Sequence, residues 1–226
     1  MKNSHLTKKV NNSHRLKTKS IWDNPSKIYY DFLRTIEELK LTKTICILGC
    51  SDGKFVLPAA KRGFKVLAID IDKIALYGGT TIVGDNKYVT MGLIKRTKIE
   101  KLMSFIEIVE ENFMLYSPRQ TFSGVFTSGS IHYEFNFEYK LEDMINKIKN
   151  YVSPGGLLLI EYIHKSDSNN NPKKHFVTAK QIAFFFKEPE WTVTSNKKKD
   201  YIEEPNPRMA SAHKIVWGRL YAKRNK

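Results

Sequence analysis

The residues with the clearest chemical potential are five small or polar ones in a row, Gly49-Cys50-Ser51-Asp52-Gly53, which directly follow the apolar run 44–48. Small residues at such a turn let the backbone approach a ligand closely, and free amides at the start of a following helix can donate to it. A second apolar run, 65–70, ends in the acid Asp70. A carboxylate at the end of the next strand can accept both hydroxyls of a ribose. Together these features indicate the chemistry of a cofactor that contains adenosine.

Alternating strand and helix patterns surround this turn. Apolar periodicity predicts helices from Asn24-Pro25 to about Lys40, after Lys54, over 141–152 and from Thr178. It predicts strands at 44–48, 65–70, 106–110, 124–127, 157–163, 191–194 and 215–222. The alternation indicates an α/β fold, a doubly wound, mostly parallel seven-stranded sheet with helices on both faces. Such sheets bind ligands beyond the carboxyl ends of their strands.

Two segments depart from this alternation. Residues 1–20 carry six basic residues and no acidic ones, so we expect a flexible basic tail before one domain at 21–226. Residues 73–103 form an unusually long connection between the second and third strands, with three glycines and a basic second half. We interpret this connection as an inserted lid or substrate element.

Composition limits the class of protein. The chain has 226 residues, with 38 Lys and Arg against 23 Asp and Glu, and a net charge of +15. With Cys46 and Cys50 as its two cysteines, a disulfide framework is excluded and a reducing cytoplasm is expected. No apolar run suits a signal peptide or a membrane helix. His175 and His213 are isolated, so no metal site is expected. The positive charge leaves an anionic partner such as RNA possible.

Three families use a glycine-rich turn of this kind. A dinucleotide site requires Gly-x-Gly-x-x-Gly, and counted from Gly49 the second and third positions are Ser51 and Lys54. A nucleophile elbow requires Gly-x-Ser-x-Gly, which Gly49–Gly53 matches literally and which would make Ser51 the nucleophile of an α/β-hydrolase. Ser51 follows the first expected strand, however, whereas a nucleophile elbow belongs to a later one. A doubly wound domain without a cofactor is a further alternative.

The third family accounts for motifs at the ends of five successive strands. These are Gly49-Cys50-Ser51-Asp52-Gly53, Asp70, Glu110-Glu111-Asn112-Phe113, Phe122-Ser123-Gly124-Val125-Phe126-Thr127-Ser128-Gly129 and Pro154-Gly155-Gly156. From about Trp22 to Lys223 the chain resembles a class I S-adenosylmethionine (SAM)-dependent methyltransferase, of the thiopurine and tellurite small-molecule type. The resemblance implies SAM as cofactor. It implies as cofactor-binding residues Gly49, Cys50, Ser51, Gly53, Asp70, Ile71, Asn112, Phe113, Ser128 and Tyr30. Asn112 stands where the family usually has an Asp.

Methyl transfer by in-line displacement needs orientation above all, and a base where the nucleophile carries a proton. His132, just past the fourth strand, is the candidate base, and Tyr133 is its candidate catalytic neighbour. Tyr162 and His164, at the end of the fifth strand, are expected to line the same pocket.

The methyl acceptor is expected to be a small molecule, because the length leaves little room for a separate RNA-binding domain. The basic tail, Lys95-Arg96 and Lys197-Lys198-Lys199 favour RNA as the alternative acceptor. The identity of the acceptor and the oligomeric state do not follow from the sequence.

Overall fold

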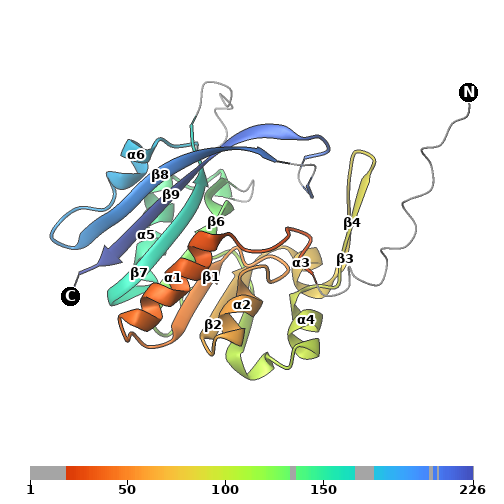
Figure 1. Ribbon diagram of the computed structural model, residues 1–226, viewed down its shortest axis with the longest axis horizontal. Coiled ribbons are helices and arrows are strands. Elements are labelled where there is room, and N and C mark those ends of the chain that lie inside the picture. Colours follow the sequence, from red (N-terminus) through yellow and green to blue (C-terminus); the bar gives the residue numbers. More distant parts are fainter. Residues whose placement is uncertain (1–18, 133–135, 166–175, 204–205, 208, 226) are drawn as a thin grey trace, which may run out of the picture.

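Seven strands form one sheet in the order β5-β2-β1-β6-β7-β9-β8 (Figure 1). The computed structural model describes residues 19–225 apart from 133–135, 166–175, 204–205 and 208. The strands are β1 Thr44–Leu48, β2 Lys65–Asp70, β5 Ile106–Glu110, β6 Phe122–Ser128, β7 Val152–Ile163, β8 Trp191–Glu203 and β9 His213–Arg224. The first five strands of the sheet run parallel, and β9 is antiparallel to both of its neighbours. The predicted fold class is confirmed.

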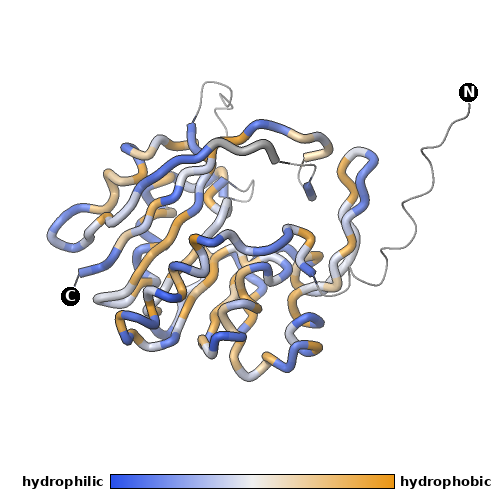
Figure 2. The backbone as a smooth tube through the Cα atoms, in the orientation of Figure 1, coloured by the Kyte–Doolittle hydropathy of each residue, from blue (hydrophilic) through white to orange (hydrophobic). Residues whose placement is uncertain are grey.

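Helices cover both faces of this sheet, because alternate residues of the buried strands point to opposite sides. Ile45 and Ile47 of β1 pack with α1 (Lys27–Glu38) and α2 (Val56–Lys61). Cys46 and Leu48 pack on the other face with α5 (Leu141–Asn150) and α6 (Ala179–Ala183). Figure 2 shows the hydrophobic central strands between more polar helices. None of the helices among the described residues is both long and apolar enough to span a bilayer.

The chain changes direction across the sheet at β1. It proceeds from β1 to β2 and β5 on one side, then returns to β6 and β7 on the other. The carboxyl ends of β1 and β6 therefore lie at the point where connections leave in opposite directions. Open α/β sheets bind their ligands in the crevice at such a point.

The connection 73–103 contains regular structure of its own. It holds α3 (Lys73–Tyr77), a hairpin of β3 (Gly79–Val83) and β4 (Asn86–Thr90), and α4 (Leu93–Ile99). A 3-10 turn, η1 (Met103–Phe105), leads into β5. Figure 1 shows the hairpin standing away from the main sheet. The insertion leaves the carboxyl end of β2 and so begins at the edge where ligands are expected.

Several element boundaries differ from the sequence prediction. Helix α1 begins at Lys27 with Ser26 as its N-cap, not at Pro25. Strands β8 and β9 extend well beyond the predicted 191–194 and 215–222 and pair with each other over most of their length. The capping box predicted at Thr178 is confirmed, because the Thr178 side chain accepts from the Gln181 amide and the Gln181 side chain accepts from the Thr178 amide.

Candidate cofactor and acceptor site

The glycine-rich turn follows β1 with an unusual backbone. Gly49, Ser51 and Gly53 all have positive φ values, of 71°, 48° and 92°. A Cβ atom on Gly49 would lie 1.9 Å from the Ser130 Oγ, so packing as well as backbone geometry requires glycine there. Ser130 belongs to η2 (Ser130–His132), just after β6. The turn is therefore fitted closely against the segment that follows the neighbouring strand.

Asp70 is bound to this turn through backbone amides. The Ser51 amide donates to Asp70 Oδ2 at 2.6 Å, and the Asp72 amide donates to Asp70 Oδ1 at 2.9 Å. Burial raises the pKa of the Asp70 carboxyl, and the amide hydrogen bonds partly offset this by favouring the charged form. The end of β2 and the turn after β1 thus form one rigid unit with a carboxylate at its centre.

Asp52, in the middle of the turn, is fully buried and joins three segments. Its carboxylate accepts from Ser20 Oγ at 2.6 Å and from the Ile21 amide at 2.9 Å. Thr90 Oγ1, at the end of β4, lies 3.3 Å from Asp52 Oδ2, and Arg96 Nη1 of α4 lies 3.4 Å from Asp52 Oδ1. Arg96 also donates to the Asp52 carbonyl oxygen. Asp52 therefore fastens both the N-terminal segment and the insertion to the turn.

Ser51 is held by an indole. Trp22 Nε1 donates to Ser51 Oγ at 2.8 Å, which places Trp22 beside the turn. No histidine is hydrogen-bonded to the Ser51 hydroxyl among the contacts of the described residues. The hydroxyl therefore lacks the partner that would make it a nucleophile.

Polar side chains link the ends of β5, β6 and β1. Asn112 Nδ2 donates to Asn136 Oδ1 at 3.2 Å, and Asn136 Nδ2 donates to the Ser130 carbonyl oxygen at 2.8 Å. Ser130 Oγ donates to the Leu48 carbonyl oxygen at 2.9 Å. The Asn112 Oδ1 atom accepts from the Met114 amide at 3.0 Å. Asn112 thus positions its own loop, and each of its side-chain polar atoms already has a partner within the protein.

A second buried carboxylate lies at the other end of the site. Glu161 of β7 accepts from Ser128 Oγ of β6 at 3.0 Å and from Arg219 Nε of β9 at 2.8 Å. The three residues are neighbours in the sheet register, so their side chains lie on one face. Ser128, predicted to bind the cofactor, is here engaged with Glu161.

His132 lies in η2 and is buried. Its Nε2 is 3.2 Å from both the amide nitrogen and the carbonyl oxygen of Ile163, at the end of β7, and its ring stacks on Phe176 at 5.7 Å between centroids. The Nδ1 atom of the ring is buried as well. Tyr133 lies outside the described residues.

The remaining predicted site residues are dispersed. Ile71 is exposed directly after Asp70, whereas the Cys50 and Phe113 side chains are buried in the two cores. Tyr30 lines a cavity on the helix face over α2, a cavity to which neither Gly49 nor Asp70 contributes. The structure therefore does not bring Tyr30 together with the turn.

Tyr162 also differs from the expectation of a pocket residue. Its side chain is fully buried in the α5 face of the core, and its hydroxyl donates to Asn196 Oδ1 at 3.0 Å. Its neighbour Glu161 faces the opposite side of β7, where the Ser128 and Arg219 contacts lie. Because side chains alternate along β7, Glu161 and not Tyr162 lies on the side of the sheet that Ser128 and Arg219 share.

A hydrogen bond joins the insertion to the β8–β9 connection beyond the carboxyl edge of the sheet. Asn86 Nδ2, at the tip of the β3–β4 hairpin, donates to the Ala210 carbonyl oxygen at 2.9 Å. A Cβ atom on Gly84 would lie 2.8 Å from the Ala210 Cβ. Two segments from opposite ends of the sheet are therefore in direct contact above the strand ends.

Sequence reasoning missed Asp52, Trp22, Glu161 and Arg219. Asp52 lies inside the glycine-rich motif, and an acid at that position is a local signal that could have identified it. The partners of Asp52 come from positions 31 to 44 residues away in the chain, and no local pattern identifies them.

The Asp70 carboxylate fits the ribose of SAM as a hydrogen-bond acceptor. A carboxylate has about four lone-pair positions. The amides of Ser51 and Asp72 use two of them and the Ile71 amide also favours the charged form, which leaves capacity for a ribose hydroxyl. Ile47 of β1 is fully buried and offers no polar group at this edge of the sheet.

No protein-family model matches the chain, and no curated protein matches its sequence. Solved structures do match its fold. TehB from Haemophilus influenzae has a TM-score of 0.66 and 13% identity, over 89% of this chain and 64% of TehB. This chain thus spans less than two thirds of the length of TehB.

In two further structures the match covers a larger share of the other chain. A 1,6-didemethyltoxoflavin-N1-methyltransferase from Burkholderia thailandensis, with bound 1,6-didemethyltoxoflavin and S-adenosylhomocysteine, has a TM-score of 0.59 and 12% identity over 88% of this chain and 78% of the other. A proposed RNA methyltransferase from Pyrococcus horikoshii has a TM-score of 0.60 and 11% identity, over 93% and 92%. These similarities establish that the chain has the class I methyltransferase fold.

Proposed function

We propose that this protein transfers a methyl group from SAM to a small-molecule acceptor. The observation that carries the proposal is the Asp70 carboxylate, which is bound to the Ser51 amide of the glycine-rich turn at 2.6 Å. This pair lies at the carboxyl ends of β1 and β2, beside the point where the chain reverses across the sheet. The similarity in fold to methyltransferases supports the proposal, although fold alone does not determine activity.

SAM, when bound, supplies an activated methyl group. The chain itself has to hold the cofactor, orient the acceptor and remove a proton where the acceptor atom carries one. Correct orientation can contribute roughly 7–11 kcal/mol to catalysis, so a densely bonded turn suits the first of these tasks. The Ser51–Asp70 and Asp52 contacts provide that rigidity.

Cofactor binding is tested by calorimetry with SAM on the full chain. Asp70→Asn keeps the size of the side chain but removes its charge, so SAM affinity should fall about tenfold or more, as expected for a charge-assisted hydrogen bond. Glu107→Gln is the matched control, because Glu107 is an exposed carboxylate on the neighbouring strand β5. Absence of SAM binding to the unaltered protein would contradict the proposal, as would equal losses in the two variants.

We assign the proton-removing role to His132. Its ring is fixed by the Ile163 backbone and by Phe176, so substitution should change the chemistry more than the cofactor site. His132→Gln should lower kcat and flatten the pH profile of kcat, with SAM affinity preserved. His213→Gln, on β9, serves as the control. An unchanged pH profile in the His132 variant would exclude it as the base.

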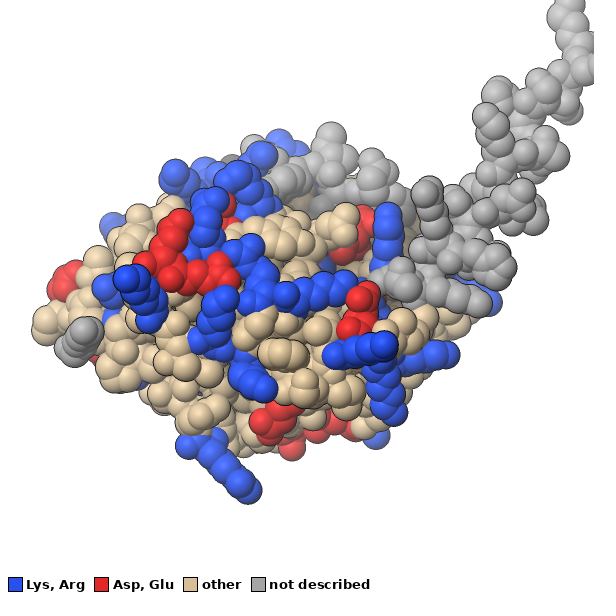
Figure 3. Space-filling model, turned by 60° about the horizontal axis from the view of Figure 1, so that its bottom comes forward, with Lys and Arg blue, Asp and Glu red and all other residues tan. Residues whose placement is uncertain are grey.

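RNA is the second candidate acceptor, supported by two observations. Lys197, Lys198 and Lys199 are exposed along the sheet-edge strand β8, and the similarity to the proposed RNA methyltransferase spans nearly both chains. Arg96, however, is mostly buried and is paired with Asp52, so its charge is compensated within the protein. Figure 3 shows basic side chains spread over one face and interrupted by acidic ones, not a continuous basic groove.

Retention of tRNA and rRNA fragments at increasing salt distinguishes the two acceptors. RNA binding should weaken steeply with salt and weaken further when Lys197, Lys198 and Lys199 are replaced by Ala. Replacement of the exposed Lys140, Lys165 and Lys180 is the control. Salt-sensitive retention that depends on the β8 lysines would favour RNA, and equal retention by both triple variants would favour the small molecule.

A further inference from the structure

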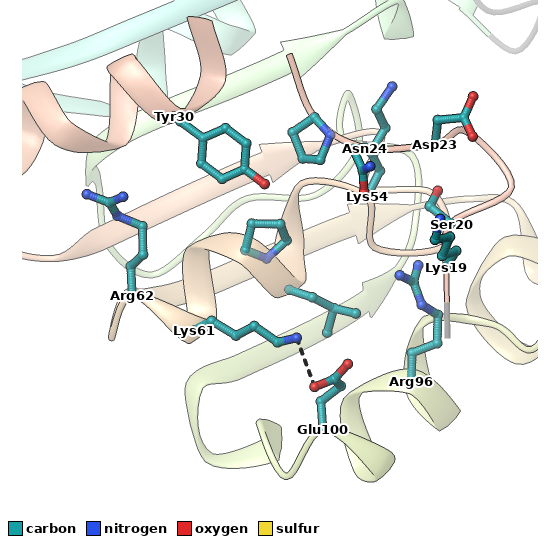
Figure 4. Close-up of a pocket in the computed structure, with 13 residues that line it drawn as sticks. Lys19, Ser20, Asp23, Asn24, Tyr30, Lys54, Lys61, Arg62, Arg96 and Glu100 are labelled. Carbon is teal, nitrogen blue, oxygen red and sulfur yellow. Dashed lines mark ion pairs between the residues drawn. The ribbon is translucent and has the colours of Figure 1, made fainter. Parts of the chain in front are cut away.

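A cavity of about 400 Å³ lies on the helix face of the molecule, outside the predicted cofactor residues apart from Tyr30 (Figure 4). Its walls come from the N-terminal segment, the start of α1, α2 and α4. Gly49, Asp70 and Ser128 do not line it. Its volume falls in the range of ligand pockets, roughly 300–1,000 Å³.

The polar walls of this cavity are mainly basic. They comprise Lys19, Lys54, Lys61, Arg62 and Arg96, against the acids Asp23 and Glu100. Lys61 Nζ of α2 pairs with Glu100 Oε2 at 2.9 Å and so bridges α2 to the end of α4. Arg62 likewise pairs with Glu37, and Arg96 pairs with Asp52. An anion entering the cavity would therefore meet chiefly Lys19 of the N-terminal segment and Lys54, just before α2. These two lysines favour a negatively charged ligand.

Part of the cavity wall is apolar. Pro25, Leu57 and Pro58 contribute apolar surface, and the Tyr30 ring is 38% exposed. Figure 4 shows Tyr30 and Arg62 on one side of the cavity and Lys19 with Arg96 on the other. A flat ring at Tyr30 and an acidic group at Lys19 would therefore lie on opposite sides of the cavity. Flat rings stack on Tyr, and phosphates bind Lys and Arg.

We propose that this cavity binds a phosphate ester carrying a flat heterocycle, the chemistry of a nucleotide, with the ring at Tyr30 and the phosphate at Lys19 and Lys54. Such a ligand could be a free mononucleotide or one nucleotide of an RNA chain. The site is separate from the proposed cofactor site and does not depend on methyl transfer.

The wall between the two sites consists of residues that also hold Asp52. Ser20 and Arg96 line the cavity, and both contact the Asp52 carboxylate. A ligand that engages either residue therefore acts on the same turn that binds Asp70 through Ser51. Binding in the cavity and binding at the turn are consequently expected to influence each other, and to the same extent in both directions.

The test is calorimetry of the full chain with AMP, UMP and a ten-nucleotide RNA, each measured with and without saturating S-adenosylhomocysteine. Lys19→Ala and Lys54→Ala should each weaken binding about tenfold, as expected for one charge-assisted contact. Lys95→Ala is the matched control, because Lys95 is an exposed lysine on α4 that does not line the cavity. Tyr30→Leu should weaken binding, and Tyr30→Phe should preserve it.

The outcomes separate the alternatives. Mononucleotide binding that persists with S-adenosylhomocysteine and follows this variant pattern supports the cavity with a free nucleotide as ligand. Tighter binding of the oligonucleotide with the same pattern supports the cavity with RNA as the source. Binding abolished by S-adenosylhomocysteine, equal loss in Lys95→Ala, or no binding of any probe overturns the proposal. These measurements require no methyltransferase activity, so they stand independently of the proposed function.

Discussion

At the end of β2 the Asp70 carboxylate is satisfied by backbone amides, whereas at the ends of β6 and β7 the Glu161 carboxylate is satisfied by other side chains. Asp70 is bound by the amides of Ser51 and Asp72. At the other end, Glu161 is bound by the Ser128 hydroxyl and the Arg219 guanidinium. The first arrangement is fixed by the path of the chain, and the second by the choice of side chains.

This difference matches the two tasks of the proposed enzyme. A cofactor that is always the same can be held by a backbone-defined turn, because backbone geometry tolerates many changes of side chain. An acceptor that varies between related enzymes requires side chains that can be exchanged. We therefore expect the β1–β2 end to be sensitive to changes of backbone and buried charge, and the β6–β7 end to tolerate single replacements better.

The largest effect is expected from Asp52→Ala. The change leaves the Arg96 guanidinium buried without its carboxylate and removes the acceptor for the Ser20 hydroxyl and the Ile21 amide. Breaking a buried ion pair from one side costs about 3–5 kcal/mol, which urea denaturation can measure as a loss in the free energy of unfolding. Asp31→Ala is the control, since Asp31 forms exposed pairs on α1 and should have a much smaller effect.

Arg96→Met, alone and combined with Asp52→Ala, completes a double-mutant cycle. If the pair accounts for the loss, the double variant should be more stable than the sum of the single effects predicts. Additive effects, or a loss no greater than that of Asp31→Ala, would show that Asp52 does not hold the N-terminal segment and the insertion to the turn.

The next largest effect is expected at the contact between the turn after β1 and Ser130, which follows β6. Gly49→Ala places a Cβ atom 1.9 Å from the Ser130 Oγ at a φ of +71°. Gly63→Ala is a matched control, because Gly63 has a φ of +81° but no heavy atom within 4 Å of its Cβ position. Both variants have a similar backbone cost, so the difference in their free energies of unfolding isolates the overpacking, about 1–3 kcal/mol. Equal destabilisation would mean that the turn is not fitted against Ser130.

A smaller effect is expected from Ser128→Ala. Its hydroxyl donates to Glu161, so the change should cost about 0.5–1.5 kcal/mol of stability, while SAM affinity stays within a factor of about three. Ser104→Ala, on the exposed η1 turn, is the control for stability. A large loss of SAM affinity with unchanged stability would instead assign Ser128 to the cofactor, as the family resemblance implies.

The sequence predicted what depends on local pattern. Strands β1, β2, β5, β6 and β7, the turn after β1 and the acid at the end of β2 follow from apolar runs and the residues that end them, whereas the hairpin β3–β4 was not predicted. The start of α1 was placed too early, because Asn24-Pro25 and Ser26 are both plausible helix starts and only the fold selects Ser26. Apolar runs and capping residues therefore predict where a helix or strand lies better than they predict its first and last residues.

The contacts of Asp52 could not be predicted in this way, because their partners lie in the N-terminal segment, in β4 and in α4. For the same reason Arg96 was grouped with the surface charge of Lys95, although it is buried. Which charges are paired inside a protein depends on tertiary contacts between distant segments, and a single sequence carries no periodic signal for them.

The smallest expected effect is a pH dependence that distinguishes Asp70 from exposed carboxylates. Burial raises the pKa of Asp70, so the folded protein takes up this proton at a higher pH than the unfolded chain. As the pH falls through that raised pKa, protonation of Asp70 therefore increases the free energy of unfolding. Protonation also lowers the affinity for SAM, because a protonated carboxyl accepts hydrogen bonds less strongly. Calorimetry with SAM at successively lower pH should reveal a decline in affinity that Asp70→Asn removes. A decline that persists in Asp70→Asn would show that another group titrates, and it would contradict the proposal that the Asp70 carboxylate binds SAM.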